Sequence, residues 1–166
     1  MPRLPRVSAA LGLAALSLLA SAPAARAVEG PGPEVMTSVT PDRMASLLQE
    51  MGYRAEIQRN DEGKRRIRTR VGGANVTVFF YTCDRDEACT SIALRAYFDD
   101  EKKKGSAFAN GWNRDKRFTK AYVDADNDAN LELDILLRGG VTPKTLRAAF
   151  DIYEDHVKDF REALYD

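Results

Sequence analysis

The chain has 166 residues with equal numbers of acidic and basic side chains, 25 of each. This length suits one ordinary domain with a single hydrophobic core. Three of the 25 basic residues and none of the 25 acidic residues lie in residues 1–27, so the 139 residues that follow carry a net charge of −3. That charge argues against a dedicated binder of nucleic acid or of anionic membranes, because such proteins neutralise phosphates with an excess of Lys and Arg.

Residues 1–27 have the three-part layout of a secretory signal peptide. Arg3 and Arg6 come first, the apolar run "LGLAALSLLA" follows, and a small-x-small cleavage site ends at Ala27. The run is shorter than the roughly 20 residues that span a bilayer, which disfavours the competing interpretation of an uncleaved anchor. We therefore expect cleavage after Ala27, export to the periplasm or beyond, and no stable membrane anchor afterwards.

Residues 28–39 contain Pro and Gly and predict a flexible leader. A helix is predicted next, because Thr40 suits an N-cap, Pro41 suits the first helical position, and Gly52 suits the exit. The apolar side chains expected on its buried stripe are Met44, Leu47, Leu48 and Met51.

Two alternating runs, "YRAEIQ" and "RRIRTRV", predict a β-hairpin joined by "NDEG". A three-residue turn ending at Gly63 pairs Ile57 with Ile67 on the apolar face. The same register places Glu56 opposite Arg68 on the solvent-facing side of the hairpin. The outward stripe Arg66, Arg68 and Arg70 is interpreted as a solvated strand face, although contact with an acidic partner stays an alternative.

The next two runs, "NVTVFFYTC" and "SIALRAYF", predict two further antiparallel strands. The first is apolar on both faces, which is typical of a central and well-covered strand. Cys83 and Cys89 lie between the two runs. In an exported protein a disulfide is the expected state of such a pair, here at a hairpin tip. A metal or redox pair is disfavoured, because C-x5-C is not the C-x2-C spacing and His156 is the only His.

Residues 106–115 predict a short helix, and "RFTKAYVD" and "LELDILLR" predict two more strands. A last helix begins at Thr142 and Pro143. Its expected buried stripe is Leu146, Phe150, Tyr153, Val157, Phe160 and Leu164. The order α-ββββ-α-ββ-α predicts one α+β domain over residues 40–166, with helices packed on a mainly antiparallel sheet.

The stretch "DADNDAN" has Asp124, Asp126 and Asp128 at alternate positions, as a calcium loop of the EF-hand type begins. Such a loop needs Gly at its sixth position and Glu at its twelfth, where this chain has Ala129 and Ile135. The flanks alternate like strands. A hairpin loop of turn-forming residues is therefore the favoured interpretation.

No arrangement of nucleophile, base and orienting group is recognisable in the sequence. No Ser has nucleophile-elbow spacing. Both Gly-Gly pairs follow predicted strands and are interpreted as turns that end them rather than as a phosphate-binding loop. His156 lies beside the apolar stripe of the last helix and is interpreted as a residue at the edge of the core. We expect a protein that is not an enzyme and that needs neither a cofactor nor a bound metal.

The stretch "NGWNRDKRF" holds the only Trp of the chain, Trp112. The structural interpretation, which sequence physics favours, packs Trp112 on the sheet, because buried aromatics dominate core energetics. The functional interpretation makes it a recognition aromatic. The candidate partner-binding residues are then Trp112, Asn113, Arg117 and Tyr122.

The run "NGWNRDKRFTKAYVDADNDANLELDILLRGGVT", preceded by the cysteine pair, resembles the YbjN family of bacterial sensory transduction regulators. The resemblance covers roughly residues 40 to 162. The matching positions are Asn113, Arg117, Phe118, Ala121, Tyr122, Asp124, Leu131, Glu132 and the run Gly139, Gly140, Val141 and Thr142. The resemblance implies a fold similar to that of type III secretion chaperones and a non-enzymatic role. It brings no catalytic residues to carry over.

The expected function is that of an exported protein- or peptide-binding module, regulatory in role, chaperone-like in shape, and a monomer or homodimer. An antiparallel sheet with an exposed edge or groove can hold an extended segment by strand addition. The alternative is a periplasmic sensor of a small ligand or divalent cation that uses the loop from Asp124 to Asp128.

Overall fold

The computed structural model describes residues 34–166 except 86 and 100–103. The predicted signal peptide, residues 1–27, and the first half of the predicted leader lie outside these described residues. Within the described part, no helix combines the length and the apolar character that crossing a membrane would require.

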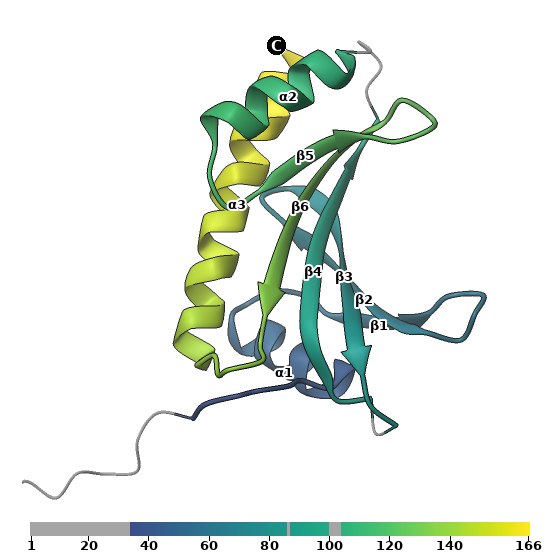
Figure 1. Cartoon of the computed structure of the whole chain (residues 1–166), viewed down its shortest axis with the longest axis vertical. Coiled ribbons are helices and arrows are strands. Elements are labelled where there is room, and N and C mark those ends of the chain that lie inside the picture. Colours follow the sequence, from purple (N-terminus) through teal and green to yellow (C-terminus); the bar gives the residue numbers. More distant parts are fainter. Residues whose placement is uncertain (1–33, 86, 100–103) are drawn as a thin grey trace, which may run out of the picture. The chain divides into compact units, whose positions relative to one another are not determined.

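The predicted element order is confirmed, with three helices and one six-stranded sheet in the described residues. The helices are α1 (Pro41–Glu50), α2 (Gly105–Asp115) and α3 (Pro143–Tyr165). The strands are β1 (Glu56–Arg59), β2 (Arg65–Val71), β3 (Ala74–Cys83), β4 (Cys89–Phe98), β5 (Lys120–Val123) and β6 (Ala129–Leu136). All neighbours pair antiparallel in the order β1-β2-β3-β4-β6-β5, so the α+β assignment holds (Figure 1).

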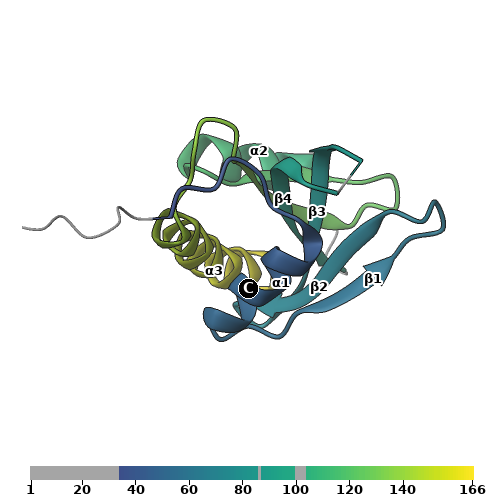
Figure 2. The same cartoon turned by 90° about the horizontal axis from the view of Figure 1, so that it is seen from below.

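The three helices pack on one face of the sheet, and the core lies between them and the strands (Figures 1 and 2). The predicted apolar stripe of α3 is buried at every position. The hydroxyl of Tyr153 donates to the carbonyl of Leu131 at 2.8 Å, which satisfies the one polar atom of that buried side chain. At Gly72, which has φ +56°, a Cβ would lie 2.8 Å from the carbonyl oxygen of Glu154, so only glycine lets the β2–β3 turn approach α3 this closely.

Both predicted helix starts are confirmed. Thr40 accepts a hydrogen bond from the backbone N–H of Arg43, and Thr142 accepts one from that of Thr145. In each case the side chain replaces an intrahelical partner that the first turn of a helix lacks.

The predicted hairpin register is confirmed as well. Ile57 lies opposite Ile67, and Glu56 lies opposite Arg68. Gly63 has φ +78°, the left-handed conformation that the three-residue turn requires. At the β5–β6 turn the carboxylate of Asp124 accepts from the backbone N–H groups of Asp126 and Asp128, so this stretch is a hairpin loop as predicted.

Residues 34–39 differ from the flexible leader that the sequence suggests. Met36 pairs with Val141 and Val39 pairs with Cys89 through backbone hydrogen bonds of 2.9 Å. Both apolar side chains are buried in the core. Burial of two large side chains outweighs the local preference of a Pro- and Gly-containing segment, which composition alone cannot reveal.

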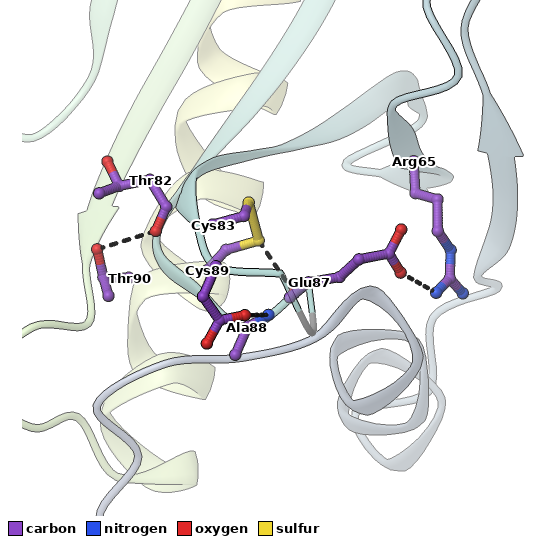
Figure 3. The surroundings of a disulfide bond; sticks show 8 residues. Arg65, Thr82, Cys83, Glu87, Ala88, Cys89 and Thr90 are labelled. Atoms are coloured by element: carbon purple, nitrogen blue, oxygen red, sulfur yellow. Dashed lines mark hydrogen bonds and ion pairs between the residues drawn. A yellow bond between two sulfur atoms is a disulfide. The ribbon is translucent and has the colours of Figure 1, made fainter.

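The predicted disulfide between Cys83 and Cys89 is confirmed at the tip of the β3–β4 hairpin. The loop that it closes also holds Glu87, whose carboxylate accepts from the guanidinium of Arg65 at 2.6 Å (Figure 3). Arg65 donates in addition to Asp42 in the first turn of α1. Arg65 thereby links β2 to both the disulfide loop and α1 at one end of the sheet.

Candidate functional site

The face of the sheet that points away from the helices is the candidate site, and it is called the uncovered face below. Three of the large apolar side chains that the described residues expose lie on it: Tyr81 (43% exposed), Tyr97 (45%) and Leu136 (65%). The prediction of β3 as a central strand is confirmed, since it is third of six. The expectation that both faces of β3 are well covered is wrong, because Tyr81 is exposed and no described helix lies on this side.

A row of charged side chains crosses the uncovered face from β4 to β5. Arg95, Glu132 and Lys120 are directly opposite one another on three adjacent strands. The carboxylate of Glu132 accepts from Arg95 Nε at 2.6 Å and from Lys120 Nζ at 2.6 Å. Glu132 is only 5% exposed, so its carboxylate is largely removed from water, whereas the side chains of Arg95 and Lys120 are 25% and 57% exposed.

Burial by itself would raise the pKa of Glu132, but the hydrogen bonds from Lys120 and Arg95 outweigh it and hold the pKa below its usual value. Burial also raises the pKa of Tyr122 to about 12, against the opposing effect of Arg95. At neutral pH the network is therefore fully ionised and Tyr122 keeps its proton.

Aromatic rings flank this network. The guanidinium carbon of Arg95 lies 4.8 Å from the ring centroid of Phe79 on one side and 5.8 Å from that of Tyr122 on the other. Cation–π contacts at these distances hold the arginine side chain in place. The centre of the uncovered face is thus ordered and combines aromatic surface with fixed charges, a composition typical of protein-recognition surfaces.

Trp112, the first of the predicted partner-binding residues, lies on the opposite side of the sheet in the core. It is 7% exposed and its ring packs edge-on against Phe160, with 4.9 Å between centroids. Its Nε1 donates to Thr119 Oγ1 at 3.0 Å, and the same oxygen lies 2.8 Å from His156 Nδ1. Trp112 therefore packs in the core, as the interpretation favoured from the sequence expects.

Asn113 links α2 to β5. Its side-chain amide accepts from the backbone N–H of Ala121 at 2.7 Å and donates to the carbonyl of the same residue at 2.9 Å. Arg117 is exposed and stacks over the exposed ring of Phe118 at 4.8 Å. Of the four predicted residues only Tyr122 lies on the uncovered face, so the structure does not bring them together. Their role in partner binding remains a prediction.

The Asp124 carboxylate is engaged by its own loop and also accepts from Asn130 Nδ2 at 3.0 Å. Across the described residues, no group of three or more His, Cys, Asp or Glu side chains is arranged to hold a metal ion. The hydrogen bonds within the loop are those that Asp and Asn side chains commonly make in turns.

The charged network was missed by sequence reasoning. Arg95 and Glu132 are 37 positions apart, and only the pairing of β4 with β6 makes them neighbours. The available signal was the alternation of polar and apolar residues in "LELD", but such a pattern does not identify the partner strand.

Comparison with known proteins gives a family and a fold neighbour. The family model YbjN, "Putative bacterial sensory transduction regulator", matches residues 40–166. A search of curated proteins finds no match. Among solved structures, the type III secretion chaperone SycH of Yersinia pestis, in complex with a stable fragment of YscM2, is similar to part of the chain. The identity is 11%, the TM-score is 0.46, and the match covers 69% of this chain and 93% of that chain.

Proposed function

The chain belongs to the YbjN family, and from that premise we propose that it is an exported, non-enzymatic regulatory module that binds a protein or peptide through its uncovered face. The observation that carries the proposal is the exposure of Tyr97 and Leu136 on either side of the ordered Arg95–Glu132 network. Exposed apolar groups around fixed charges suit a partner surface, because the charges set orientation and the apolar groups supply binding energy.

Export is supported by two features of the chain. The pattern of residues 1–27 is that of a signal peptide. The disulfide between Cys83 and Cys89 fits an oxidising compartment, since disulfides rarely persist in a reducing cytosol. The sites of action that follow are the periplasm or the extracellular space.

The proposal is tested by affinity capture from an envelope extract of the source organism, with captured proteins quantified by mass spectrometry. Leu136→Asp places an unpaired carboxylate in the proposed interface, so we expect at least tenfold less of the specific partner to be captured. Ala148→Asp is the matched control, because Ala148 is an exposed residue of α3 on the far side of the molecule.

With the control variant, capture should equal that of the wild-type protein. Loss of the partner with Ala148→Asp and not with Leu136→Asp would move the interface to the helices and contradict the proposal. So would the same set of captured proteins, in the same amounts, for all three forms.

A further inference from the structure

Strands β2 and β3 separate before either of them ends. Their pairing stops at Ile67 and Val78, although β2 begins at Arg65 and β3 continues to Cys83. Figure 1 shows the β1–β2 hairpin pointing away from the lower ends of β3 and β4. A groove of about 660 Å³ lies in the gap, lined by the hairpin tip on one side and by residues 79–83 of β3 on the other.

The backbone on both walls of this groove is oriented for strand pairing. In an antiparallel sheet, alternate residues direct their N–H and C=O groups to alternate neighbours. Ile67 and Val78 face each other as the last pair of β2 and β3. Two residues further along β3, Phe80 therefore directs its N–H and C=O toward the gap, and Arg65 does the same from β2. An extended segment in the gap would meet hydrogen-bonding groups that the register leaves open.

The side chains of the groove favour acidic groups in such a segment. Arg65 is already paired with Asp42 and Glu87, and Lys64 is paired with Glu62. The Nε of Arg66, in contrast, is buried and has no hydrogen-bond partner among the described residues. Arg66 also lines the groove. Because a buried donor of a charged group is costly to leave unsatisfied, a rotation of this side chain that pairs its guanidinium with a carboxylate in the groove would be favourable.

Charge over the whole hairpin agrees with that preference. Residues 54–70 contain seven Lys or Arg and three Asp or Glu, whereas the chain as a whole is balanced. Beside Arg66, the outward rings of β3 supply apolar surface, with Phe79 half-buried and Tyr81 exposed on the uncovered face. The groove thus offers strand-forming backbone, a guanidinium whose Nε has no partner among the described residues, and aromatic surface, all within a few residues.

We propose that this groove binds an extended acidic segment of a partner protein, which adds a strand to β3 at Phe80, places a carboxylate on Arg66 and packs an apolar side chain against Phe79 and Tyr81. The disulfide and the contact of Arg65 with Glu87 hold residues that line the groove in place before binding (Figure 3). Such pre-organisation lowers the entropy cost of binding. This inference rests on the proposed function. It specifies which part of the uncovered face binds the partner and what kind of segment the partner supplies.

The test is fluorescence anisotropy with a fluorescein-labelled ten-residue peptide of alternating Glu and Val. We expect saturable binding by the oxidised protein, and about tenfold weaker binding by Arg66→Ala, since a hydrogen bond to a charged group is lost. Tyr81→Ala, at an exposed position, should also weaken it. Arg138→Ala is the matched control, because Arg138 is an exposed arginine beyond β6.

Two further probes isolate the two kinds of contact. A Lys–Val peptide should not bind, because its charges repel Arg66. A Glu–Val peptide with N-methyl groups at alternate residues should bind at least tenfold more weakly, because it cannot donate along one edge. Absence of saturable binding, equal losses with Arg66→Ala and Arg138→Ala, or a ten-residue DNA oligonucleotide bound as tightly as the Glu–Val peptide would overturn the proposal.

The outcome is separable from that of the capture experiment. If Leu136→Asp abolishes capture while the peptide fails to bind, the groove assignment is wrong and the broader function stands. If the capture experiment fails while Arg66-dependent peptide binding is measured, the groove stands, and the partner approaches without contacting Leu136.

Discussion

Replacing Trp112 by alanine is expected to lower the free energy of unfolding by about 3–5 kcal/mol, the usual cost of deleting a buried Trp or Phe side chain. The ring is 7% exposed and packs against Phe160 and His156, so its removal leaves a cavity between α2 and α3. Urea denaturation followed by circular dichroism measures the change.

The matched control is Phe118→Ala, which removes an aromatic ring that is 59% exposed and should change the free energy of unfolding by no more than about 0.5 kcal/mol. Equal effects of the two substitutions would contradict the burial of Trp112. Since Trp112→Ala removes part of the core, loss of partner binding in that variant would not identify a contact residue. Trp112→Phe keeps an aromatic ring in the core, although it removes the donor to Thr119, and is the more suitable variant for binding experiments.

Replacing Glu132 by alanine is expected to lower the free energy of unfolding by about 2–3 kcal/mol at neutral pH. Only a quarter of the Arg95 side chain is exposed, and the substitution removes its carboxylate partner. Removing one member of a fully buried pair costs about 3–5 kcal/mol, and the partial exposure of Arg95 and of Lys120 reduces that figure. Thermal or urea denaturation measures the loss.

The effect should depend on pH in a defined direction. The pKa of Glu132 is lower in the folded protein than the value of about 4.3 in unfolded chains. Its ionised form therefore stabilises the fold above that pH, and the contribution is lost as the pH falls through the lower folded value. The difference between wild type and Glu132→Ala should shrink in acid.

Asp134→Ala is the control for this pair of measurements, because Asp134 is the next outward carboxylate of β6 and is exposed. It should cost no more than about 0.5 kcal/mol at either pH. A cost for Glu132→Ala that matched that of Asp134→Ala, or that grew in acid, would contradict the buried network.

The elements themselves were predictable because their signals are local. Each of two helix starts is marked by an adjacent Thr and Pro, Thr40 with Pro41 and Thr142 with Pro143. The register of β1 with β2 followed from the length of one turn. The buried stripe of α3 followed from its helical period.

The site was less predictable, since it depends on pairings between distant segments. Nothing local places β6 between β4 and β5, yet that order creates the Glu132 network. The groove likewise arises where β2 and β3 stop pairing, while the alternation of both strands continues past that point. Met36 and Val39 were assigned to a leader because composition does not reveal a distant core.

Binding through the uncovered face is the central claim, and photo-crosslinking in living cells tests it most directly. A photoreactive benzoylphenylalanine replaces Tyr97 on that face or, as the comparison, Arg147 on the exposed side of α3. We predict a discrete crosslinked protein from position 97 and little or none from position 147. A crosslink of equal or greater yield from position 147 would contradict the claim.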